Sequence, residues 1–456
     1  MKLFDLKNKK IGLVGLGVSN LQLANYLTNF TDNIFVTEQL PFEKIKSILS
    51  QLHPSVKYEC GGHTDKILDS DIVIRSPGIP LHNPLIKRIL GKNIPIFTEL
   101  ELAYQILISK LGSEPLIIAI TGTNGKTTTT TLIGKICSSF KKTVVCGNIG
   151  EPLTKFLDSA TVDTIFVIEV SSYQLEDIVN FKPKIGCILN ITEDHLDHHL
   201  SMENYIKSKF NIFKNMTQND YAVLNYDDIN IRNYTPTVSK ATIVNFSKSH
   251  KLDYGCWYDR TSSSAIFNFK NIYESINVKT SLIGEHNLEN ITAAITCCLL
   301  TGIPKDIIEN EIKQFRGVEH RLEFVREING VIYINDSKST NVNSTVVALK
   351  SFSNPVHLIL GGRDKGAPYT PLIPLIKQKV KSLLLIGEAT DVIYQQLKDL
   401  SVNVYKCETL ENAVKKAKEI SVSGDVVLLS PACSSFDQFT NYEHRGKVFK
   451  HIVENL

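Results

Sequence analysis

The sequence predicts an α/β protein with three domains, each built on an open, mostly parallel sheet with flanking helices. The chain has 456 residues, which is the length of about three typical domains. Strand-like apolar runs also alternate with helical patterns, and this is typical of parallel α/β layers. The runs fall into three sets, one for each expected sheet. They are 11–15, 34–37 and 71–74; then 115–120, 143–146, 164–168 and 185–189; and finally 330–334, 356–360, 382–386 and 425–429.

Two joints between domains are expected where helical patterns give way to glycine-containing loops. A helix is predicted over 99–110, and the segment 111–115, Leu-Gly-Ser-Glu-Pro, indicates a linker after it. The second joint is expected at 316–320, Arg-Gly-Val-Glu-His. The predicted domains are therefore residues 1–110, 111–317 and 318–456.

The composition favours a soluble cytoplasmic protein that acts on small molecules. Hydrophobic residues make up 43% and charged residues 21%, and the net charge is only +3, so nucleic acid or an anionic membrane is not expected as a partner. The nine cysteines contain no CxxC pair, which suits a reducing compartment. The first apolar run, 11–16, is short and broken by glycines, so it predicts a strand and not a signal peptide. We expect no membrane insertion, and we expect a monomer.

The segment 121–127, Thr-Gly-Thr-Asn-Gly-Lys-Thr, predicts a phosphate-binding loop. It lies between an apolar strand, 117–120, and a helix beginning near Thr129. Its glycines allow backbone N–H groups to converge on phosphate oxygens, and the helix start adds the positive end of its dipole. The lysine supplies a charge for the β and γ phosphates, and the following threonine hydroxyl can bind Mg²⁺. The residues expected to hold ATP here are Gly122, Thr123, Asn124, Gly125, Lys126 and Thr127. The general P-loop pattern has a further glycine where this chain has Ile120, so the motif is a variant.

Two following strands end in possible metal ligands. Glu169 comes directly after the strand 164–168, at the sheet edge where ligands bind in open α/β folds. The alternative is a carboxylate that caps a helix. The next strand leads into 192–199, Thr-Glu-Asp-His-Leu-Asp-His-His, which without the loop at Lys126 would be interpreted as a surface loop of solvated charges. Beside a triphosphate, hard oxygen ligands favour Mg²⁺, and His195 becomes a plausible ligand.

These pieces, in this order, resemble the Mur ligases over nearly the whole chain. Mur ligases are ATP-dependent amide-forming enzymes that assemble the peptide of the bacterial cell wall, and folylpolyglutamate synthetase is a relative. The segments 334–341, Ile-Asn-Asp-Ser-Lys-Ser-Thr-Asn, and 428–439, Leu-Leu-Ser-Pro-Ala-Cys-Ser-Ser-Phe-Asp-Gln-Phe, look like those of the family member that adds D-glutamate. The resemblance implies Rossmann-like N- and C-terminal domains around a central domain of the P-loop ATPase type.

The resemblance implies roles for residues around the phosphates. Lys126 would contact the γ-phosphate, and Thr127 and Glu169 would share one Mg²⁺. His195 would serve a second Mg²⁺, and Lys209 aligns with a lysine that the family carries in carbamylated form. Carbamylation turns a cation into a carboxylate-like ligand, which suits a site beside Mg²⁺. Without the resemblance, Lys209 would be taken for a solvated helix residue.

The resemblance also implies which residues contact the rest of ATP and the two substrates. The nucleotide would be contacted by Asn290 at the adenine, Arg321 at the γ-phosphate, Asp336 at the ribose and Lys338 close to the phosphate. The carboxylates of D-glutamate would meet Lys365, Thr340, Ser435 and the backbone near Tyr442, and Asn148 would lie beside the reacting carboxylate. Lysine and hydroxyl donors are what a dicarboxylate requires.

A second glycine-rich loop follows the first strand. The segment 12–20, Gly-Leu-Val-Gly-Leu-Gly-Val-Ser-Asn, suggests a dinucleotide-binding Rossmann unit, although Asn20 replaces the third glycine of GxGxxG. Glu38 lies where a ribose-binding acid could stand, which keeps a nicotinamide oxidoreductase open as an alternative. The resemblance implies instead that Val18 and Ser19 contact the diphosphate of a UDP-sugar substrate. The residues after Glu38, Gln39-Leu40, depart from the family pattern for uracil contacts.

The expected reaction follows from the resemblance. The L-alanine carboxylate of UDP-N-acetylmuramoyl-L-alanine would attack the γ-phosphate of ATP, and the amine of D-glutamate would displace phosphate from the acyl phosphate. Lys126, Arg321 and two Mg²⁺ would stabilise charge on the transferring group. The alternatives are a family ligase for another amino acid or for folate-linked glutamate, the oxidoreductase above, and a catalytically silent nucleotide-binding regulator.

Overall fold

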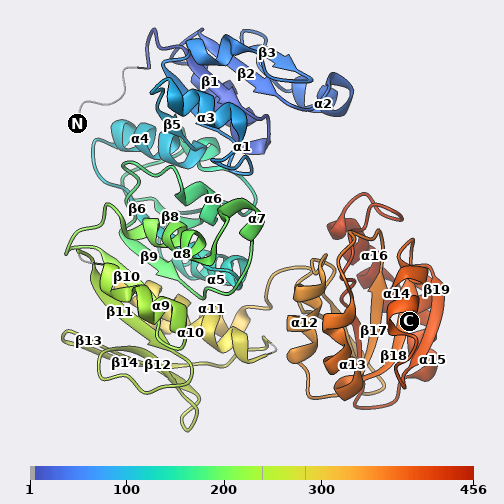
Figure 1. The fold of residues 1–456 in the computed structure, drawn as a ribbon. Coiled ribbons are helices and arrows are strands. Elements are labelled where there is room, and N and C mark those ends of the chain that lie inside the picture. The colour runs from blue at the N-terminus through green and yellow to red at the C-terminus, as the bar shows by residue number, and fades with distance from the viewer. Residues whose placement is uncertain (1–5, 239, 283) are drawn as a thin grey trace. The chain divides into compact units, whose positions relative to one another are not determined.

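The computed structural model describes residues 6–238, 240–282 and 284–456, and it confirms the predicted three-sheet α/β fold (Figure 1). The chain divides into two compact units. The first contains the residues up to Lys279 together with Leu288–Lys313, and the second contains Thr280–Asn287 and Gln314–Leu456. Among the described residues, no helix combines the length and apolar character needed to cross a membrane.

The N-terminal sheet is a parallel five-stranded sheet of Rossmann type. Its strand order is β3 (Lys57–Cys60), β2 (Ile34–Glu38), β1 (Ile11–Val14), β4 (Ile72–Arg75) and β5 (Ile96–Phe97). Its helices are α1 (Val18–Leu27), α2 (Phe42–Leu49) and α3 (Pro84–Gly91), with a 3-10 turn at Asp65–Asp69. The chain runs from β1 outward through β2 to β3 and then crosses to β4 on the other side of β1. The glycine loop after β1 therefore lies at the switch point of the sheet, where ligands bind in such folds.

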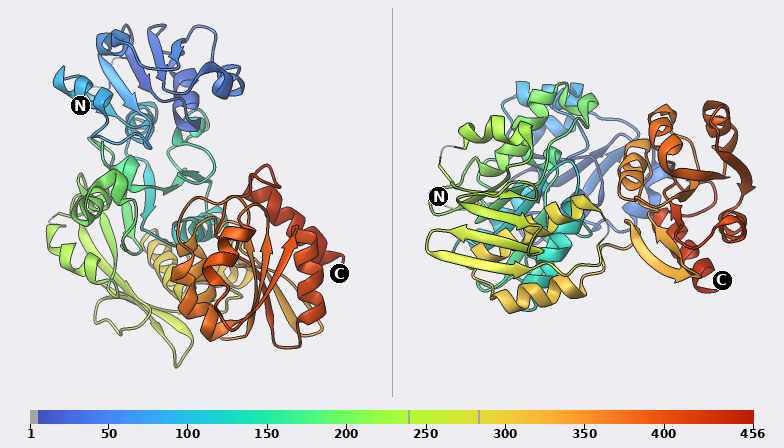
Figure 2. Two further views of the ribbon diagram at one scale, coloured as in Figure 1. Left: turned by 45° about the vertical axis from the view of Figure 1, so that its right-hand side comes forward. Right: turned by 90° about the horizontal axis from the view of Figure 1, so that it is seen from below.

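The central sheet has nine strands and carries the second glycine loop on β6. Its order is β14 (Ile272–Asn277), β13 (Ser264–Phe269), β12 (Gly255–Asp259), β11 (Thr242–Ser247), β10 (Tyr221–Asn225), β9 (Ile185–Ile188), β6 (Leu116–Thr121), β8 (Ile165–Glu169) and β7 (Thr143–Gly147). Strands β6 to β12 pair with one another in parallel. Strands β12–β14 form an antiparallel extension, yellow-green in Figure 2. Because β8 and β9 flank β6, their carboxyl ends meet at the loop after β6.

The helices of the central domain lie between these strands in sequence. They are α5 (Lys126–Ser138), α6 (Ser172–Leu175), α7 (Leu196–His199), α8 (Met202–Phe210), α9 (Ile229–Tyr234), α10 (Glu285–Leu300) and α11 (Lys305–Gln314), with 3-10 turns at Leu153–Phe156, Asn211–Phe213 and Thr235–Thr237. Residues of α5 pack on β7 and β8. The sequence had indicated a helix over 129–137, and the helix begins three residues earlier, at the lysine of the glycine loop.

The C-terminal sheet forms the core of the second unit. Its order is β15 (Glu323–Ile328), β16 (Val331–Asn335), β20 (Val426–Leu429), β17 (Val356–Gly361), β18 (Val380–Ile386) and β19 (Asn403–Glu408), all parallel except the β15–β16 pair. Helices α12 (Val342–Lys350), α13 (Ile373–Lys379) and α14 (Thr390–Leu397) cover one face, and α15 (Leu410–Ile420) and α16 (Tyr442–Glu454) cover the other. A 3-10 turn occupies Thr370–Leu372. The carboxyl ends of β16, β20 and β17 are therefore neighbours.

The helix α4 (Glu99–Leu111) joins the N-terminal and central sheets into one unit. It matches the predicted helix, and its residues from Glu99 to Leu107 are buried. One hydrophobic cluster runs from the N-terminal sheet through α4 to the central domain. Two carboxylates of α4 anchor it. Glu99 accepts hydrogen bonds from the backbone N–H and hydroxyl of Thr154, and Glu101 accepts three from the backbone of 179–181.

Replacing Glu101 with alanine should destabilise the first unit strongly. The substitution leaves one buried and two partly buried backbone N–H groups of 179–181, at 2.8 to 3.1 Å from its carboxylate, without their acceptor. We expect a loss of about 3 kcal/mol in the free energy of unfolding, measured by urea denaturation. The control is Glu114→Ala, which removes an exposed carboxylate paired with Lys182 and should change stability little. Equal stability of the two variants would contradict the anchoring role.

Candidate active site

The loop after β6 has a backbone conformation that only glycine adopts easily. Gly122 has a φ of +152° and Gly125 has a φ of +83°. A Cβ atom on Gly125 would lie 2.2 Å from the Oδ1 atom of Asn290, and one on Gly122 would lie 3.1 Å from Leu189. Left-handed backbone and close approach therefore both require these glycines. Asn290, the residue expected at the adenine, lies directly against the loop.

A single side chain from the neighbouring strand braces this loop. The Oδ1 atom of Asn190, just after β9, accepts a hydrogen bond from the N–H of Asn124 at 2.8 Å. Its amide nitrogen donates to the carbonyl of Asn124 and to Glu289. The backbone carbonyl of Asn190 accepts from the N–H of Thr123 at 2.8 Å. The Thr123 and Asn124 N–H groups are therefore bound within the protein, and the strand beside β6 holds the loop in place.

Two lysines converge on the carbonyl oxygen of Gly122. Lys126 donates to it at 2.8 Å, and also to the carbonyl of Thr123, and Lys209 from α8 donates to it at 2.9 Å. Lys209 is buried, and its amine lies 4.6 Å from the ring centre of Tyr205. Burial and the charge of Lys126 hold the pKa of the Lys209 amine well below its ordinary value, against the opposing effect of Asp194. Lys209 is thus a buried, easily deprotonated amine and not a solvated helix residue.

Glu169 and Asn148 come together at the ends of β8 and β7. The Asn148 side-chain amide donates to Oε1 of Glu169 at 2.7 Å, and its backbone N–H donates to the carbonyl of Glu169. Glu169 is 2% exposed. Within the described part of the chain, nothing donates a hydrogen bond to its Oε2 atom. A buried carboxylate oxygen without a donor fits a hard cation such as Mg²⁺, and the hydroxyl residue Thr127 lies in the first turn of α5, a helix that packs on β8.

His195 lies on the loop between β9 and α7, at the same sheet edge. It is half exposed, and its ring centre lies 5.0 Å from that of Tyr173. Burial, together with the charges of Lys209 and Lys126, lowers the pKa of the His195 imidazole, although Asp194 acts in the opposite direction. The neutral form of an imidazole is the form that binds a metal. The structure thus brings Lys126 together with Lys209, and Asn148 together with Glu169, and it places His195 within the electrostatic influence of the two lysines. Thr127 lies next to Lys126 in the first turn of α5.

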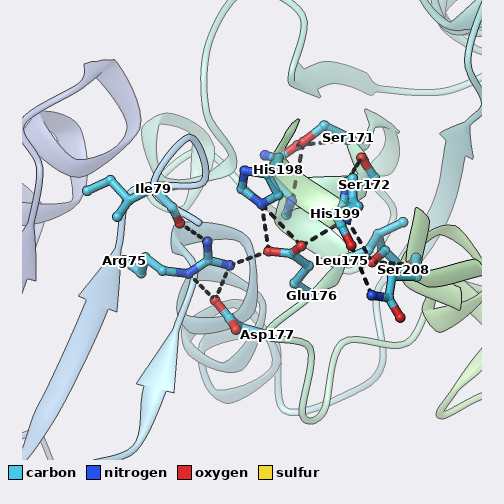
Figure 3. A network of polar contacts seen from close by, with 12 residues as sticks. Arg75, Ile79, Ser171, Ser172, Leu175, Glu176, Asp177, His198, His199 and Ser208 are labelled. Carbon is cyan, nitrogen blue, oxygen red and sulfur yellow. Dashed lines mark hydrogen bonds and ion pairs between the residues drawn. The ribbon is translucent and has the colours of Figure 1, made fainter. Parts of the chain in front are cut away.

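A network of charged groups surrounds Glu176 (Figure 3). Glu176 accepts hydrogen bonds from His198 and His199, and it forms an ion pair with Arg75 of β4 at 2.9 Å. Arg75 also pairs with Asp177. Burial opposes ionisation of Glu176, but the hydrogen bonds from His199 and His198 and the charge of Arg75 outweigh it, so the pKa of Glu176 lies below its ordinary value.

The loop after β1 is stabilised differently from a dinucleotide-binding loop. Asn20, in place of the third glycine, donates its amide to the carbonyls of Val14 and Gly15. The carboxylate of Glu38 accepts from the backbone N–H of Leu16 at 2.7 Å and from that of Leu40 at 2.9 Å. Both features hold the chain around Gly15, which has a φ of +83°. The expected contact residues Val18 and Ser19 open α1, with Val18 62% exposed.

In the second unit, Asp336 lies at the end of β16. Its carboxylate accepts from the backbone N–H of Leu322 at 3.2 Å and from the hydroxyl of Ser430 at 2.8 Å. Burial raises the pKa of Asp336 to about 6, despite hydrogen bonds from Ser339 and Ser430 and the nearby charge of Arg321. The structure therefore places the predicted residues Asp336 and Arg321 near each other.

A buried arginine organises the loops that hold the remaining predicted residues. Arg445 of α16 is 0% exposed and donates to the hydroxyl and carbonyl of Ser337 and to the carbonyls of Cys433 and Ser434. Ser337 in turn donates to the carbonyl of Tyr442. Arg363 and Ser434 exchange hydrogen bonds that join the next two loops.

These cross-links gather the loops of the predicted substrate residues at one edge of the C-terminal sheet. Ser435 is buried, Lys338 and Tyr442 are in cation–π contact with the amine 6.0 Å from the ring centre, and Lys365 is exposed. Thr340 follows in the loop that continues from Lys338.

Three residues that shape these sites were not anticipated from the sequence. Asn190 could have been noticed, because it closely follows β9, the strand beside the glycine loop. The sequence did not indicate that Glu176 and Arg445 are buried or functional, because each lies in a helix-like pattern in which a charged residue normally faces solvent. Their functions depend on partners distant in the sequence.

Comparisons with known proteins agree with this geometry. Three family models match: the MurD N-terminal domain over residues 10–84, the Mur ligase middle domain over 120–298, and the glutamate ligase domain of Mur ligases over 320–433. The chain is 42% identical over 457 residues to UDP-N-acetylmuramoylalanine–D-glutamate ligase of Clostridioides difficile, covering 99% of this chain and 100% of that protein. It is 44% identical over 460 residues to the enzyme of the same name from Caldicellulosiruptor saccharolyticus, with the same coverage.

Solved structures share the fold at low sequence identity. UDP-N-acetylmuramate-alanine ligase MurC from Thermotoga maritima is 19% identical with a TM-score of 0.57, covering 98% of this chain and 100% of that one. The MurF ligase from Thermotoga maritima, solved in complex with ADP, is 16% identical with a TM-score of 0.59, covering all of both chains. These likenesses support the three-domain architecture.

Substituting Gly125 with alanine should weaken nucleotide triphosphate binding by more than about tenfold. The methyl group would collide with Asn290 and displace the loop from the start of α5. Isothermal titration with a non-hydrolysable ATP analogue measures the effect. The matched control is Gly112→Ala, which also has a positive φ, +67°, but nothing within 4 Å of the added methyl. Unchanged affinity in Gly125→Ala would contradict the assignment of this loop to phosphate.

Proposed function

The chain belongs to the Mur ligase family, and from that membership we propose that it is the ATP-dependent ligase that adds D-glutamate to UDP-N-acetylmuramoyl-L-alanine. The observation that carries the proposal is the convergence of Lys126, Glu169, His195 and Lys209 at the carboxyl ends of β6, β8 and β9. Relatives that bear the D-glutamate ligase name match at 42–44% identity over their full length. The glutamate ligase domain matches over 320–433.

The reaction has to convert an unreactive carboxylate into an acylating agent. The L-alanine carboxylate attacks the γ-phosphorus of ATP, the bond to the β-phosphate oxygen breaks, and ADP leaves. The amine of D-glutamate then attacks the acyl phosphate carbonyl, loses a proton and displaces inorganic phosphate. The protein contributes mainly position and electrostatic stabilisation, since phosphoryl transfer needs little covalent help.

The residues of the first unit are assigned to the phosphoryl transfer. The loop Gly122–Thr127 and Lys126 hold the β and γ phosphates, Asn290 contacts the adenine, and Asn148 orients the reacting carboxylate. Thr127, Glu169, His195 and a carbamylated Lys209 would hold two Mg²⁺ ions. When bound, Mg²⁺ neutralises charge that develops on the phosphate oxygens. Val18 and Ser19 contact the diphosphate of the UDP-sugar, since they open α1 at the switch point of the N-terminal sheet.

The residues of the second unit are assigned to the nucleotide and to D-glutamate. Arg321 acts on the γ-phosphate, Asp336 on the ribose and Lys338 near the phosphate. The two carboxylates of D-glutamate pair with Lys365, Thr340, Ser435 and the backbone at Tyr442. The support is that the loops bearing these side chains meet at one sheet edge, where Arg445 and the Arg363–Ser434 pair fix them.

We further propose that the protein works as a monomer in the cytoplasm. Its proposed substrates are soluble small molecules, and its net charge of +3 provides no strong field for nucleic acid or anionic lipid. Its nine cysteines are unpaired, as expected in a reducing compartment.

A ligase assay tests the proposed function directly. Purified protein is incubated with ATP, Mg²⁺, UDP-N-acetylmuramoyl-L-alanine and radiolabelled D-glutamate. We expect label in a UDP-linked product and phosphate release that requires both substrates. L-Alanine, a diamino acid and L-glutamate serve as competing substrates and should not be incorporated. Phosphate release that is equal without any amino acid would rule out amide formation.

Variants of the glycine loop connect this activity to the site. Lys126→Ala should lower kcat by at least about a hundredfold, because it removes a charge from the transferring phosphoryl group. The control Lys141→Ala removes an exposed lysine just after the same helix and should retain activity. Binding of ATP without synthesis in the unmodified protein would instead indicate a regulator.

Lys209 is expected to react with carbon dioxide. Its buried amine has a lowered pKa, and the unprotonated amine is the form that attacks CO₂. Protein equilibrated with ¹³C-bicarbonate should show a carbamate carbon resonance in NMR that is absent from Lys209→Arg. The control Lys207→Arg alters an exposed lysine of the same helix, paired with Glu203, and should keep the resonance. A resonance that persists in Lys209→Arg would assign the carbamate elsewhere.

A further inference from the structure

We propose that Arg75 and Glu176 are positioning residues that hold the segment of His195 in register with the substrate-diphosphate loop. The inference rests on the proposed function, which gives His195 to a metal and the loop after β1 to the diphosphate. The inference adds a physical connection between the segment of His195 and the loop after β1. The link consists of contacts that join β4 of the N-terminal sheet to α6 and α7 of the central domain (Figure 3).

The segment that carries His195 is strained and short, so it needs an external anchor. His195 has a φ of +55° and Leu200 has a φ of +67°, and both are non-glycine residues in the left-handed region. Such a conformation costs about 1 kcal/mol or more for each residue. Between them lies α7, which has only four residues and contributes little helical stability of its own. Contacts from outside the segment must therefore maintain its geometry.

Glu176 provides that anchor through both histidines of α7. The Nε2 atom of His198 lies 3.1 Å from each Glu176 oxygen, and Nδ1 of His199 lies 3.1 Å from Oε1. The other ring nitrogen of His199 lies 2.9 Å from the hydroxyl of Ser172. Tyr173 packs on the same rings, with centres 4.1 Å and 5.4 Å away, and on His195 itself. The anchor thus fixes the helix that begins one residue after His195.

Arg75 connects the anchor to the N-terminal sheet. Its side chain is fully buried and contacts Glu176 at 2.9 Å, Asp177 at 2.6 Å and the carbonyl of Ile79. Ile79 closes a turn with Ser76, whose N–H donates to the carbonyl of Val14 at the end of β1. A Cβ atom on Gly15 would lie 2.9 Å from Ser76 and 3.0 Å from Ile79. The turn held by Arg75 is therefore packed against the glycine loop assigned to the diphosphate.

Glu176, His198 and His199 also carry the kinds of ligand atom that a transition-metal site uses. Among the described residues, Glu176, His198 and His199 are the group of histidine, cysteine and acidic residues whose ligand atoms lie within 4.8 Å of one another. Arg75 already supplies a positive charge to Glu176, and imidazole N–H donors satisfy its oxygens. A positioning role therefore accounts for the cluster without a metal.

The Arg75–Glu176 link would affect where the substrate carboxylate meets the γ-phosphate. The UDP-sugar would be anchored at the loop after β1, and the metal at His195. Residues that hold first ligands in place commonly change metal affinity or activity by about 10- to 100-fold when they are replaced. Breaking the Arg75–Glu176 link should therefore change the metal dependence of the reaction while leaving the glycine loop of β6 intact.

The experiment compares Glu176→Gln and Arg75→Met with the unmodified protein. Glutamine keeps the size of Glu176 but replaces one acceptor with a donor, so at least one histidine loses its partner. We expect the Mg²⁺ concentration for half-maximal activity to rise about tenfold in both variants, and KM for ATP to change less than twofold. Arg75→Lys, which retains the charge, should recover part of the loss. Mn²⁺ binding in the presence of a non-hydrolysable ATP analogue, followed by electron paramagnetic resonance, should weaken in parallel.

Controls separate positioning from general destabilisation. Lys110→Met removes another ion pair between the N-terminal and central domains, with Asp158, that does not touch α7, and it should leave the Mg²⁺ dependence unchanged. A purely structural role would lower the melting temperature and the active fraction without changing half-saturation by Mg²⁺ or Mn²⁺. Folded Glu176→Gln with an unchanged Mn²⁺ affinity would overturn the inference. Failure of the unmodified protein to form the amide would instead refute the proposed function, and the Mn²⁺ measurement does not depend on it.

Discussion

Two lysine amines donate hydrogen bonds to one backbone carbonyl, that of Gly122, and this concentration of charge governs the active site. Lys126 and Lys209 come from helices far apart in the sequence, and each lies within 2.9 Å of that oxygen. Burial, together with the charge of Lys126, lowers the pKa of the Lys209 amine and favours its neutral form. The nearby carboxylate of Glu169 offers an oxygen that receives no hydrogen bond within the described residues. Under the proposed function, a lysine for the phosphates and a carboxylate oxygen for the metal would thus come from neighbouring strands of one sheet.

The departure from the general P-loop pattern at Ile120 has a structural explanation. Ile120 belongs to β6, where its carbonyl accepts from Val170 and the residue pairs with Glu169. The strand thus continues to Thr121, and only four residues separate it from α5. So short a loop cannot fold back over the phosphates by itself, and Asn190 holds it from the neighbouring strand. The rigidity that a longer loop obtains from its own turns is supplied here by the sheet.

The sequence predicted those parts of the fold and site that depend on local pattern. The strands β1, β6, β8 and β16 and the helix α4 follow from apolar runs and caps, and Glu169 follows from its place at a strand end. Strands β3, β5, β10 to β15 and β19 were not anticipated. Of these, β3, β5, β14, β15 and β19 lie at sheet edges and β12 to β14 form an antiparallel extension, whereas β10 and β11 are inner parallel strands that the apolar runs did not reveal. The burial of Lys209 could not be read from periodicity, since an alternating pattern of lysines on α8 resembles a solvated face. Only the resemblance to a family indicated it.

The connections between distant residues explain why the N-terminal and central domains behave as one unit. Glu101 anchors α4 to the backbone of 179–181, and Arg75 reaches Glu176 and Asp177 just before that segment. Both contacts pair a buried charge with several partners, so removing either side leaves an uncompensated charge or unpaired donors in the interior. These contacts join the loop after β1 and the segment of His195 within one compact unit. Under the proposed function, the same contacts would help to place the reacting carboxylate of a substrate that spans both domains.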